Sequence, residues 1–465
     1  MTKEGHRLDP ADWDSFGQDM HDLLDTCLAR MQSARDLPWQ QKPDHMGVEL
    51  DGKATPTADV FAQLANTVMP YATGNTHPAF FGWVHGTGMP VSVGAEMVAA
   101  TMNSNCGGRD HGAAEVEREV IHWLTRTAGM PHDAFGILTT GTSQATILAL
   151  SAARARAFGM ELRKKGIRGM PEVRVYMAKG AHSCVAKALE IMGHGSDCVR
   201  AIPVNSLSQM DIPALTAAIA EDRANGLAPL AIVGTAGSVG VGAYDDLNAV
   251  ADIAQAENIW MHVDAAFGFW SRLADSPFRE LSDGIGRADS IALDTHKWPG
   301  VQYDCGACLM ADRDLHRATF SSRPAYLESA KSGLAGGDLW FCDYGIELSR
   351  GFKALKVWTA IKAIGADAMG QAITDNCKQA ALMADLVNAS PHLTLQHEVI
   401  SNLCCFSLVK GDVTKIAADL QIAGRGVFST ITVNDVPCLR AAIVGHRTTS
   451  DDIRAAIKAV EETQG

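Results

Sequence analysis

Residues 259–298 read IWMHVDAAFGFWSRLADSPFRELSDGIGRADSIALDTHKW and contain two apolar runs that each end in polar residues. Asp264 follows the first run, and His296 and Lys297 follow the second. Short apolar runs without alternation are typical of strands buried on both faces of a parallel sheet. Because such sheets bind ligands beyond the carboxyl ends of their strands, we expect Asp264 and Lys297 to face one ligand site. A simple salt bridge is the alternative that this pair alone leaves open.

Helical and strand-like segments alternate on both sides of this stretch, from about residue 110 to 310. The apolar segments 135–140, 173–178, 199–204 and 230–235 predict further strands, and amphipathic stretches such as 113–129 predict the helices between them. This alternation predicts an α/β fold with a mostly parallel sheet. We expect an N-terminal helical arm for dimerisation at 1–75, a large α/β domain at 76–350 and a small α+β domain at 351–465.

Composition limits the possible partners and compartments. The chain has 465 residues, a formal net charge of −13 and no run of 18 uncharged apolar residues, so we expect no nucleic-acid or membrane partner and a small-molecule substrate. The eleven cysteines are scattered, which favours reduced thiols and a cytoplasmic protein. Cys305 and Cys308 form a C-x-x-C inside an apolar run, and we interpret it as a core strand and expect no metal site.

A third segment, GILTTGTSQAT at 136–146, leads from a predicted strand into a predicted helix. It gathers Thr142 and Ser143 at a helix N-terminus, where backbone N–H groups and the helix dipole stabilise a phosphate. An ordinary Thr/Ser N-cap behind a glycine turn is the alternative reading. It is not a Walker loop, because no G-K-[ST] follows.

A phosphate cup, a carboxylate and a lysine at one sheet edge are the groups that pyridoxal 5′-phosphate (PLP) requires. The amine of Lys297 can form an imine with the cofactor aldehyde, and the carboxylate of Asp264 can keep the pyridine nitrogen protonated. A protonated ring acts as an electron sink. The three segments together therefore predict a PLP site.

The strings GILTTGTSQATILAL, AHSCVAKA, HVDAAFG and DSIALDTHKW, in this order and spacing, resemble the group II PLP-dependent amino-acid decarboxylases. This group includes the aromatic amino-acid, glutamate, histidine and diaminobutyrate decarboxylases. The resemblance covers roughly residues 60 to 360 well and the C-terminal part more weakly. It implies PLP fold type I and a homodimer with its sites at the interface, and it is poorly specific for the substrate.

The resemblance also implies roles for individual residues. Lys297 would be the Schiff-base lysine and Asp264 the pyridinium partner, and His182 would stack on the cofactor ring. The remaining cofactor contacts would come from Thr142 and Ser143 at the phosphate with help from His296, from Ala266 on the opposite ring face, and from Ser238, or alternatively Thr235, near the 3′-oxygen.

Further matches concern the substrate side of the site. Tyr326 falls in SRPAYLESAKSGLAGGD, which resembles the mobile loop whose tyrosine closes over the site. In THPAFFGWVHGTGMP, the candidates for the substrate pocket are Phe81, Trp83 and His85. Arg109, in NCGGRDHGAAEVE, stands where common members carry small residues; it either reads a polar substrate or belongs to a charge cluster at a helix start.

The resemblance implies α-decarboxylation of an L-amino acid to its amine and carbon dioxide. Carbon–carbon lysis and decarboxylation coupled to oxidative deamination, which gives an aldehyde, use the same kind of site and stay open. A non-catalytic PLP-binding protein is the third alternative.

Overall fold

The computed structural model describes residues 8–322, 332–337 and 339–464. Its centre is a seven-stranded sheet with the order β1-β7-β6-β5-β4-β2-β3. The strands are β1 (Phe135–Thr139), β2 (Val173–Ala178), β3 (Val199–Ile202), β4 (Ala228–Thr235), β5 (Trp260–Asp264), β6 (Ser290–Asp294) and β7 (Gly306–Met310). Strands β2 to β6 pair in parallel, whereas β7 is antiparallel to both β1 and β6. The predicted α/β fold with a mostly parallel sheet is confirmed.

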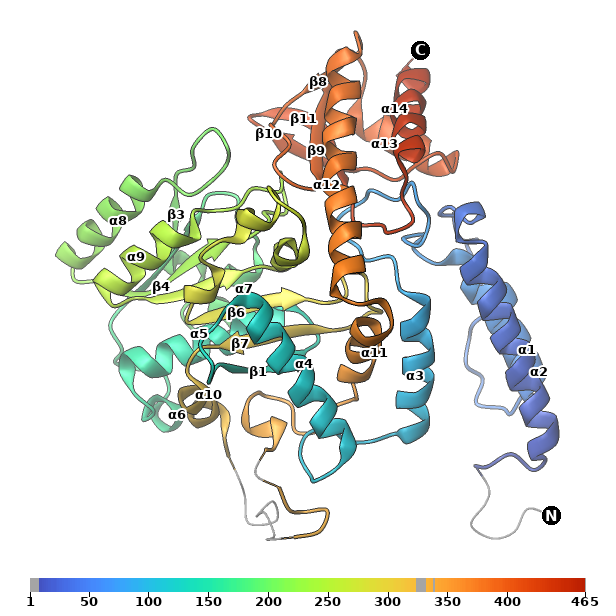
Figure 1. The fold of residues 1–465 in the computed structure, drawn as a ribbon, viewed down its shortest axis with the longest axis horizontal. Helices are drawn as coiled ribbons and strands as arrows, with labels where there is room; N and C mark the ends of the chain where they lie inside the picture. The colour runs from blue at the N-terminus through green and yellow to red at the C-terminus, as the bar shows by residue number, and fades with distance from the viewer. Residues whose placement is uncertain (1–7, 323–331, 338, 465) are drawn as a thin grey trace.

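Helices join and cover these strands (Figure 1). They are α4 (Gly112–Ala128), α5 (Thr142–Phe158), α6 (Leu162–Lys165), α7 (Cys184–Ile191), α8 (Ile212–Ala224), α9 (Leu247–Glu257) and α10 (Arg313–Phe320). In α4 the apolar stripe buries Val120, Ile121 and Leu124, and the helix ends at Gly129, whose φ of 72° is the left-handed conformation that favours glycine. Burial of these stripes against the apolar strands builds one continuous core.

A second, smaller sheet lies in the C-terminal part of the chain. Its antiparallel order is β10-β11-β9-β8, from β8 (Leu393–Leu395), β9 (Leu403–Leu408), β10 (Ser429–Val433) and β11 (Val436–Ala442). The helices α12 (Ala366–Ala389), α13 (Val413–Ile422) and α14 (Ser450–Gln464) enclose a separate hydrophobic cluster with it. The domain boundaries at 75 and 350 stay a prediction from the sequence.

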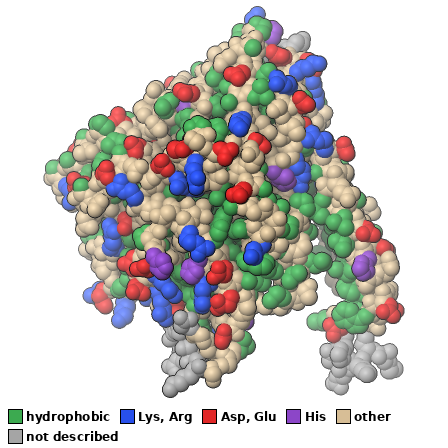
Figure 2. Space-filling model, in the orientation of Figure 1, with side chains coloured by type: hydrophobic (Ala, Val, Ile, Leu, Met, Phe, Trp, Pro, Cys, Tyr) green, Lys and Arg blue, Asp and Glu red, His purple; other side chains and the backbone are tan. Residues whose placement is uncertain are grey.

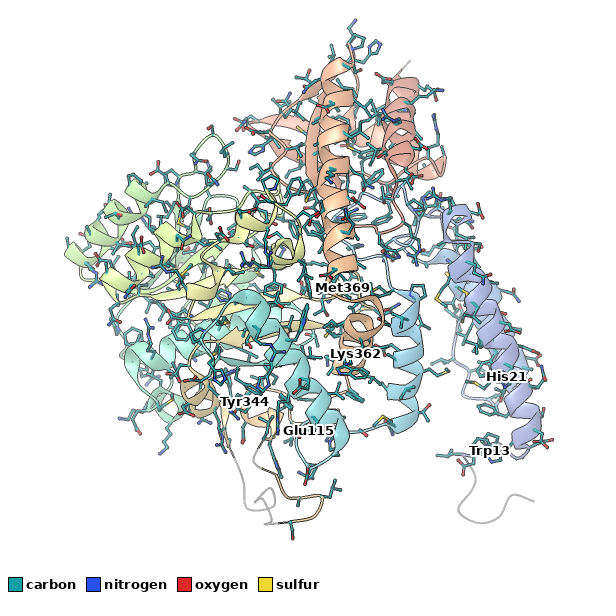
Figure 3. The ribbon with its side chains drawn as sticks, viewed as in Figure 1. Trp13, His21, Glu115, Tyr344, Lys362 and Met369 are labelled. Atoms are coloured by element: carbon teal, nitrogen blue, oxygen red, sulfur yellow. The ribbon has the colours of Figure 1, made fainter. Side chains whose placement is uncertain are left out.

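The N-terminal segment lies along one side of the molecule (Figure 1). Helix α1 (Trp13–Gln32) and helix α2 (Thr57–Gln63) bury none of their residues, and Figure 3 shows Trp13 and His21 on α1, away from both sheets. Helices α3 (Pro90–Met102) and α11 (Ala354–Ile364) pack on each other. Among the described residues, no helix combines the length and the apolar character that crossing a bilayer requires.

Candidate active site

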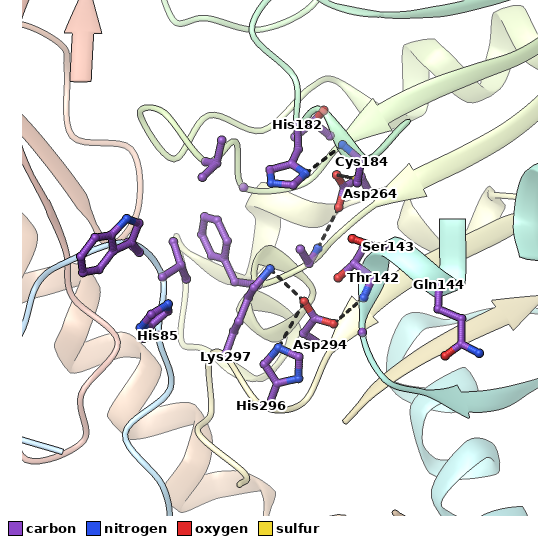
Figure 4. A pocket seen from close by; sticks show the side chains of 18 of the residues that line it. His85, Thr142, Ser143, Gln144, His182, Cys184, Asp264, Asp294, His296 and Lys297 are labelled. Atoms are coloured by element: carbon purple, nitrogen blue, oxygen red, sulfur yellow. Dashed lines mark hydrogen bonds and ion pairs between the residues drawn. The ribbon is translucent and has the colours of Figure 1, made fainter. Parts of the chain in front are cut away.

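A cavity of about 460 Å³ opens where β4, β5 and β6 end and where α5 begins (Figure 4). The last residues of these three neighbouring strands, Thr235, Asp264 and Asp294, all line the cavity. The strands pair in register, with Thr235 opposite Asp264. The cavity thus occupies the position at which open α/β sheets bind their ligands.

Lys297 reaches the cavity from the turn that follows β6. Its Nζ lies 2.8 Å from Oδ2 of Asp294, and three quarters of its side chain is shielded from solvent. Within the described part of the chain, the ion-pair partner of Lys297 is therefore Asp294 and not Asp264. The simple salt bridge that the sequence left open is thus not the arrangement found.

Asp264 is a buried carboxylate on the cavity wall. Its Oδ1 accepts a hydrogen bond from the Ala266 N–H at 3.2 Å, and the Cys184 Sγ lies 3.8 Å from its Oδ2. Burial raises the pKa of Asp264, and the charges of Lys297 and His182 oppose this rise. A buried anion is costly unless a cation meets it, and a protonated pyridine nitrogen in the cavity would supply that cation.

The first turn of α5 forms the opposite wall. Thr142 donates its backbone N–H to Asp294 Oδ1 at 2.7 Å, and Ser143 follows on the same turn. The hydroxyls of Thr142 and Thr235 are buried and have no hydrogen-bond partner among the described residues. Buried polar groups rarely lack partners, so a ligand that carries phosphate and ring oxygens would satisfy them. The residues of this cavity therefore fit PLP.

Two histidines border the same space. His182 accepts the Cys184 backbone N–H at Nδ1, at 3.1 Å, so a neutral imidazole carries its proton on Nε2. His296 accepts the Cys305 N–H at Nδ1, also at 3.1 Å, and its Nε2 lies 3.7 Å from Asp294 Oδ2. Burial lowers the pKa of His296, while Asp294 partly restores it. His182 is exposed, whereas His296 is buried.

Most residues singled out from the sequence meet at this cavity. It is lined by Trp83, His85, Thr142, Ser143, His182, Asp264, Ala266, His296 and Lys297. Tyr326 lies outside the described residues.

Phe81, Ser238 and Arg109 do not line the cavity. Phe81 is fully buried in the cluster of the small sheet, where its N–H donates to the Val427 carbonyl at 2.7 Å. The substrate-pocket prediction for Phe81 is thereby corrected. Trp83 has a left-handed backbone with a φ of 50°, which interrupts the segment, so Phe81 does not share a side with Trp83, which lines the cavity.

Ser238 and Arg109 each have another local role. The Ser238 hydroxyl accepts the Ala243 N–H at 3.0 Å and so stabilises a turn, whereas Thr235 lines the cavity. The Arg109 guanidinium lies 4.7 Å from the centroid of the Trp340 ring, a cation–π contact. Of the two alternatives for the residue near the 3′-oxygen, Thr235 lines the cavity and Ser238 does not, while Arg109 lies on the Trp340 ring.

The lining residues that sequence reasoning missed include Asp294 and Cys184. Asp294 is the last residue of an apolar strand, as Asp264 is, so the strand-end rule that selected Asp264 also applies to Asp294. Cys184 gives no comparable signal, because a small apolar-like residue in a helix is ordinarily core.

Comparisons with known proteins agree with this site. The family model described as the pyridoxal-dependent decarboxylase conserved domain matches residues 38–409. The aromatic-L-amino-acid decarboxylase of Bacillus atrophaeus is 29% identical, over 86% of this chain and 84% of that protein. The phenylacetaldehyde synthase of Arabidopsis thaliana is 25% identical, over 98% of this chain and 97% of that protein.

A solved structure shares the fold. The crystal structure of Oryza sativa TDC with PLP and tryptamine superposes with a TM-score of 0.89 at 24% identity, covering 98% of this chain and 99% of that one. The family match spans most of the chain and includes every cavity residue described above. The chain therefore belongs to the pyridoxal-dependent decarboxylase family and is a PLP-dependent enzyme of the carboxy-lyase class.

Proposed function

We propose that this enzyme removes the α-carboxylate of an L-amino acid as carbon dioxide and releases the corresponding amine, with Lys297 bonded to the cofactor. One observation carries this proposal: Lys297, the buried carboxylate of Asp264 and the N-terminus of α5 face a single cavity. Bound PLP supplies an electron sink for the carbanion that remains at Cα when carbon dioxide leaves.

The protein side of this chemistry follows from the positions of the side chains. Asp264 holds a proton on the ring nitrogen, because its carboxylate is buried and charged groups in a low-dielectric site interact strongly. Thr142, Ser143 and the N–H groups of the first turn of α5 bind the phosphate. Thr235 offers its unpaired hydroxyl to a ring oxygen.

His182 holds a proton at Nε2 and lines the cavity, so it can orient the substrate carboxylate or donate that proton. Ala266 and His182 both line the cavity, so we assign them to the two faces of a flat ring bound there. We assign His296 to the phosphate side, since it is fixed by its bond from Cys305.

The walls that this subunit contributes favour a substrate with a neutral side chain. Apart from Asp264, Asp294 and Lys297, the lining residues of the described chain carry no fixed charge. Trp83, Val84 and His85 form one wall, with Val239 and Phe267 also lining the cavity. An aromatic or apolar side chain loses little hydration there, whereas a second carboxylate or ammonium would need a partner of opposite charge.

Aldehyde formation is the second candidate, because one relative named above is a phenylacetaldehyde synthase. Carbon–carbon lysis has no comparable support. A non-catalytic PLP-binding protein is not retained, since the chain belongs to a family of enzymes.

Two measurements test the proposal. Borohydride reduction of the yellow holoenzyme, followed by peptide mapping, should place the cofactor on Lys297; a label on another lysine would overturn the assignment. Incubation with the common amino acids and a set of non-standard ones under air should give carbon dioxide and an amine. Aldehyde with ammonia and peroxide would instead establish the second candidate.

Assembly as a homodimer with the sites at the interface is supported by exposed apolar side chains on the N-terminal helices and on α3. These side chains include Trp13, Leu28, Val60, Met97, Val98 and Met102, and Figure 2 shows hydrophobic side chains gathered where the arm faces the body. An exposed apolar surface of this kind is typical of an interface. Sedimentation that gives a monomer at micromolar concentration would contradict it.

A cytoplasmic location is supported by the eleven cysteines, which form no disulfide in the described part of the chain. Fractionation of the source cells, with the protein detected by antibody, tests this location.

A further inference from the structure

Asp294 contacts both the lysine and the start of α5, where the phosphate is predicted to bind. Its Oδ1 accepts the backbone N–H of Thr142 at 2.7 Å, and its Oδ2 lies 2.8 Å from Nζ of Lys297 (Figure 4). The side chain is only 3% exposed. A single carboxylate thus connects the end of β6, the start of α5 and the reactive nitrogen.

The two carboxylate oxygens of Asp294 make different kinds of contact. The hydrogen bond at Oδ1 satisfies one of the N–H groups that a helix leaves unpaired at its start, and an amide oxygen could do the same. The contact at Oδ2 is between opposite charges in a site largely shielded from water, where a positive charge on the nitrogen is stabilised. Only an ionised carboxylate provides this second contact.

We propose that Asp294 is the internal counter-ion of Lys297, which keeps a positive charge on Nζ and holds this nitrogen in a fixed position relative to the first turn of α5. The inference rests on the proposed bond between Lys297 and the cofactor. A positively charged nitrogen makes the adjoining carbon more electrophilic, so the counter-ion would favour attack by the substrate amine.

Other groups also bear on the charge of this nitrogen. Asp264 is a second anion across the cavity and interacts with Lys297. Further titratable groups of the described chain interact with Lys297 or Asp294, namely His85, His296, Cys184 and Tyr303, and His182 interacts with Asp264. Burial lowers the pKa of His85 and His296 and raises that of Cys184 and Tyr303, so all four favour their neutral forms. Asp294 is the anion in direct contact.

The test uses the reconstituted holoenzyme and its visible absorbance as a function of pH. The absorbance band of the cofactor bound to Lys297 changes when the nitrogen loses its proton. In Asp294→Asn, the midpoint of this change should fall by about 1 to 3 pH units, the usual effect of removing an opposite charge at contact distance. The same variant should bind PLP nearly as well as wild type, because the amide oxygen still accepts the Thr142 N–H.

Asp294→Ala removes both contacts, so it should lower the midpoint and also weaken PLP binding by roughly tenfold, the loss of one hydrogen bond to a charged group. Fluorescence titration of the cofactor-free protein with PLP measures this affinity. Since Asn is nearly isosteric with Asp, the Asn variant keeps the proposal testable if the Ala variant does not fold.

Asp289→Asn is the matched control at the amino end of the same strand. Asp289 likewise accepts a backbone N–H, from Met261 at 2.7 Å, and pairs with a cation, Arg156, at 2.9 Å. Its replacement should leave the midpoint unchanged.

A midpoint in Asp294→Asn within a few tenths of a pH unit of wild type would overturn the proposal, as would an equal shift in Asp289→Asn. Failure of borohydride to label Lys297 in wild type would instead show that the proposed function is wrong.

Discussion

Replacement of Asp264 by Asn should lower the turnover number of this enzyme without lowering the stability of the cofactor-free protein. Burial raises the pKa of the Asp264 carboxyl above its ordinary value, so the folded protein binds this proton more tightly than the unfolded chain. The stabilising contribution of this group is therefore present at low pH and is lost as the pH rises through the folded-state pKa. At neutral pH the buried charge is a cost, and the cofactor-free Asn variant should be at least as stable as wild type.

The loss of activity can be estimated from the proposed contact between the Asp264 carboxylate and the ring nitrogen of PLP. A carboxylate in contact with the ring nitrogen raises the pKa of that nitrogen by about 1 to 3 units. Each unit corresponds to about 1.4 kcal/mol, so a neutral amide would weaken the electron sink by about 1.4 to 4 kcal/mol. We expect the turnover number to fall by about 10-fold to 1000-fold while part of the PLP affinity is retained.

The assay combines carbon dioxide release at saturating substrate, PLP titration and thermal unfolding of the cofactor-free protein. Asp222→Asn provides a control for replacing a buried carboxylate far from the cavity, since Asp222 lies on α8 and pairs with Arg200 at 2.8 Å. Its turnover should match wild type once folded. Activity of Asp264→Asn within a few-fold of wild type would refute the assigned role. If the loss of activity is fully explained by weaker PLP binding, the role of Asp264 is limited to binding the cofactor.

Three further predictions use other parts of the molecule. Tyr326→Phe should lower amine formation by at least about 100-fold and shift products toward aldehyde and peroxide under air, because Phe cannot donate a proton; unchanged amine would exclude Tyr326 as the donor. Glu117→Gln should lower the free energy of unfolding by about 3 to 5 kcal/mol in urea titrations, because the fully buried Arg350 loses the carboxylate that lies 2.6 Å from its guanidinium. A decrease below about 1 kcal/mol would contradict this estimate. Burial lowers the pKa of His262 and His316 from 6.5 to about 4, so the unfolding free energy should decline as the pH falls from about 6.5 toward 4, and His316→Asn should flatten this decline.

The central sheet and the polar residues at the ends of its strands could be predicted from the sequence. Buried parallel strands are apolar along their whole length, so a polar residue such as Asp264 that ends one is conspicuous. The same contrast identified the start of α5, where Thr142 follows a glycine. The edges of the small sheet were less visible, because β8 has three residues and β10 alternates between partly buried and exposed positions.

Side chains carried by loops were harder to place, because their direction depends on contacts distant in sequence. Phe81 points into the small domain because its segment pairs with the backbone of Val427. Ser238 does not line the cavity, and its hydroxyl accepts a hydrogen bond from the Ala243 N–H within a local turn. Neither partner can be recognised from spacing alone.

The position of Asp294 shows why a strand-end rule identifies a site more readily than it assigns roles within it. Asp264 and Asp294 end adjacent strands of one sheet, and each accepts a backbone N–H. They differ in their other contacts: Asp264 lines the cavity beside the Cys184 thiol, whereas Asp294 is joined to Lys297 and Thr142. We therefore propose different functions for two chemically identical residues, one toward the cofactor ring and one toward the lysine. The pH dependence of the absorbance in Asp264→Asn and Asp294→Asn should differ accordingly, since only the second removes the charge in direct contact with Nζ.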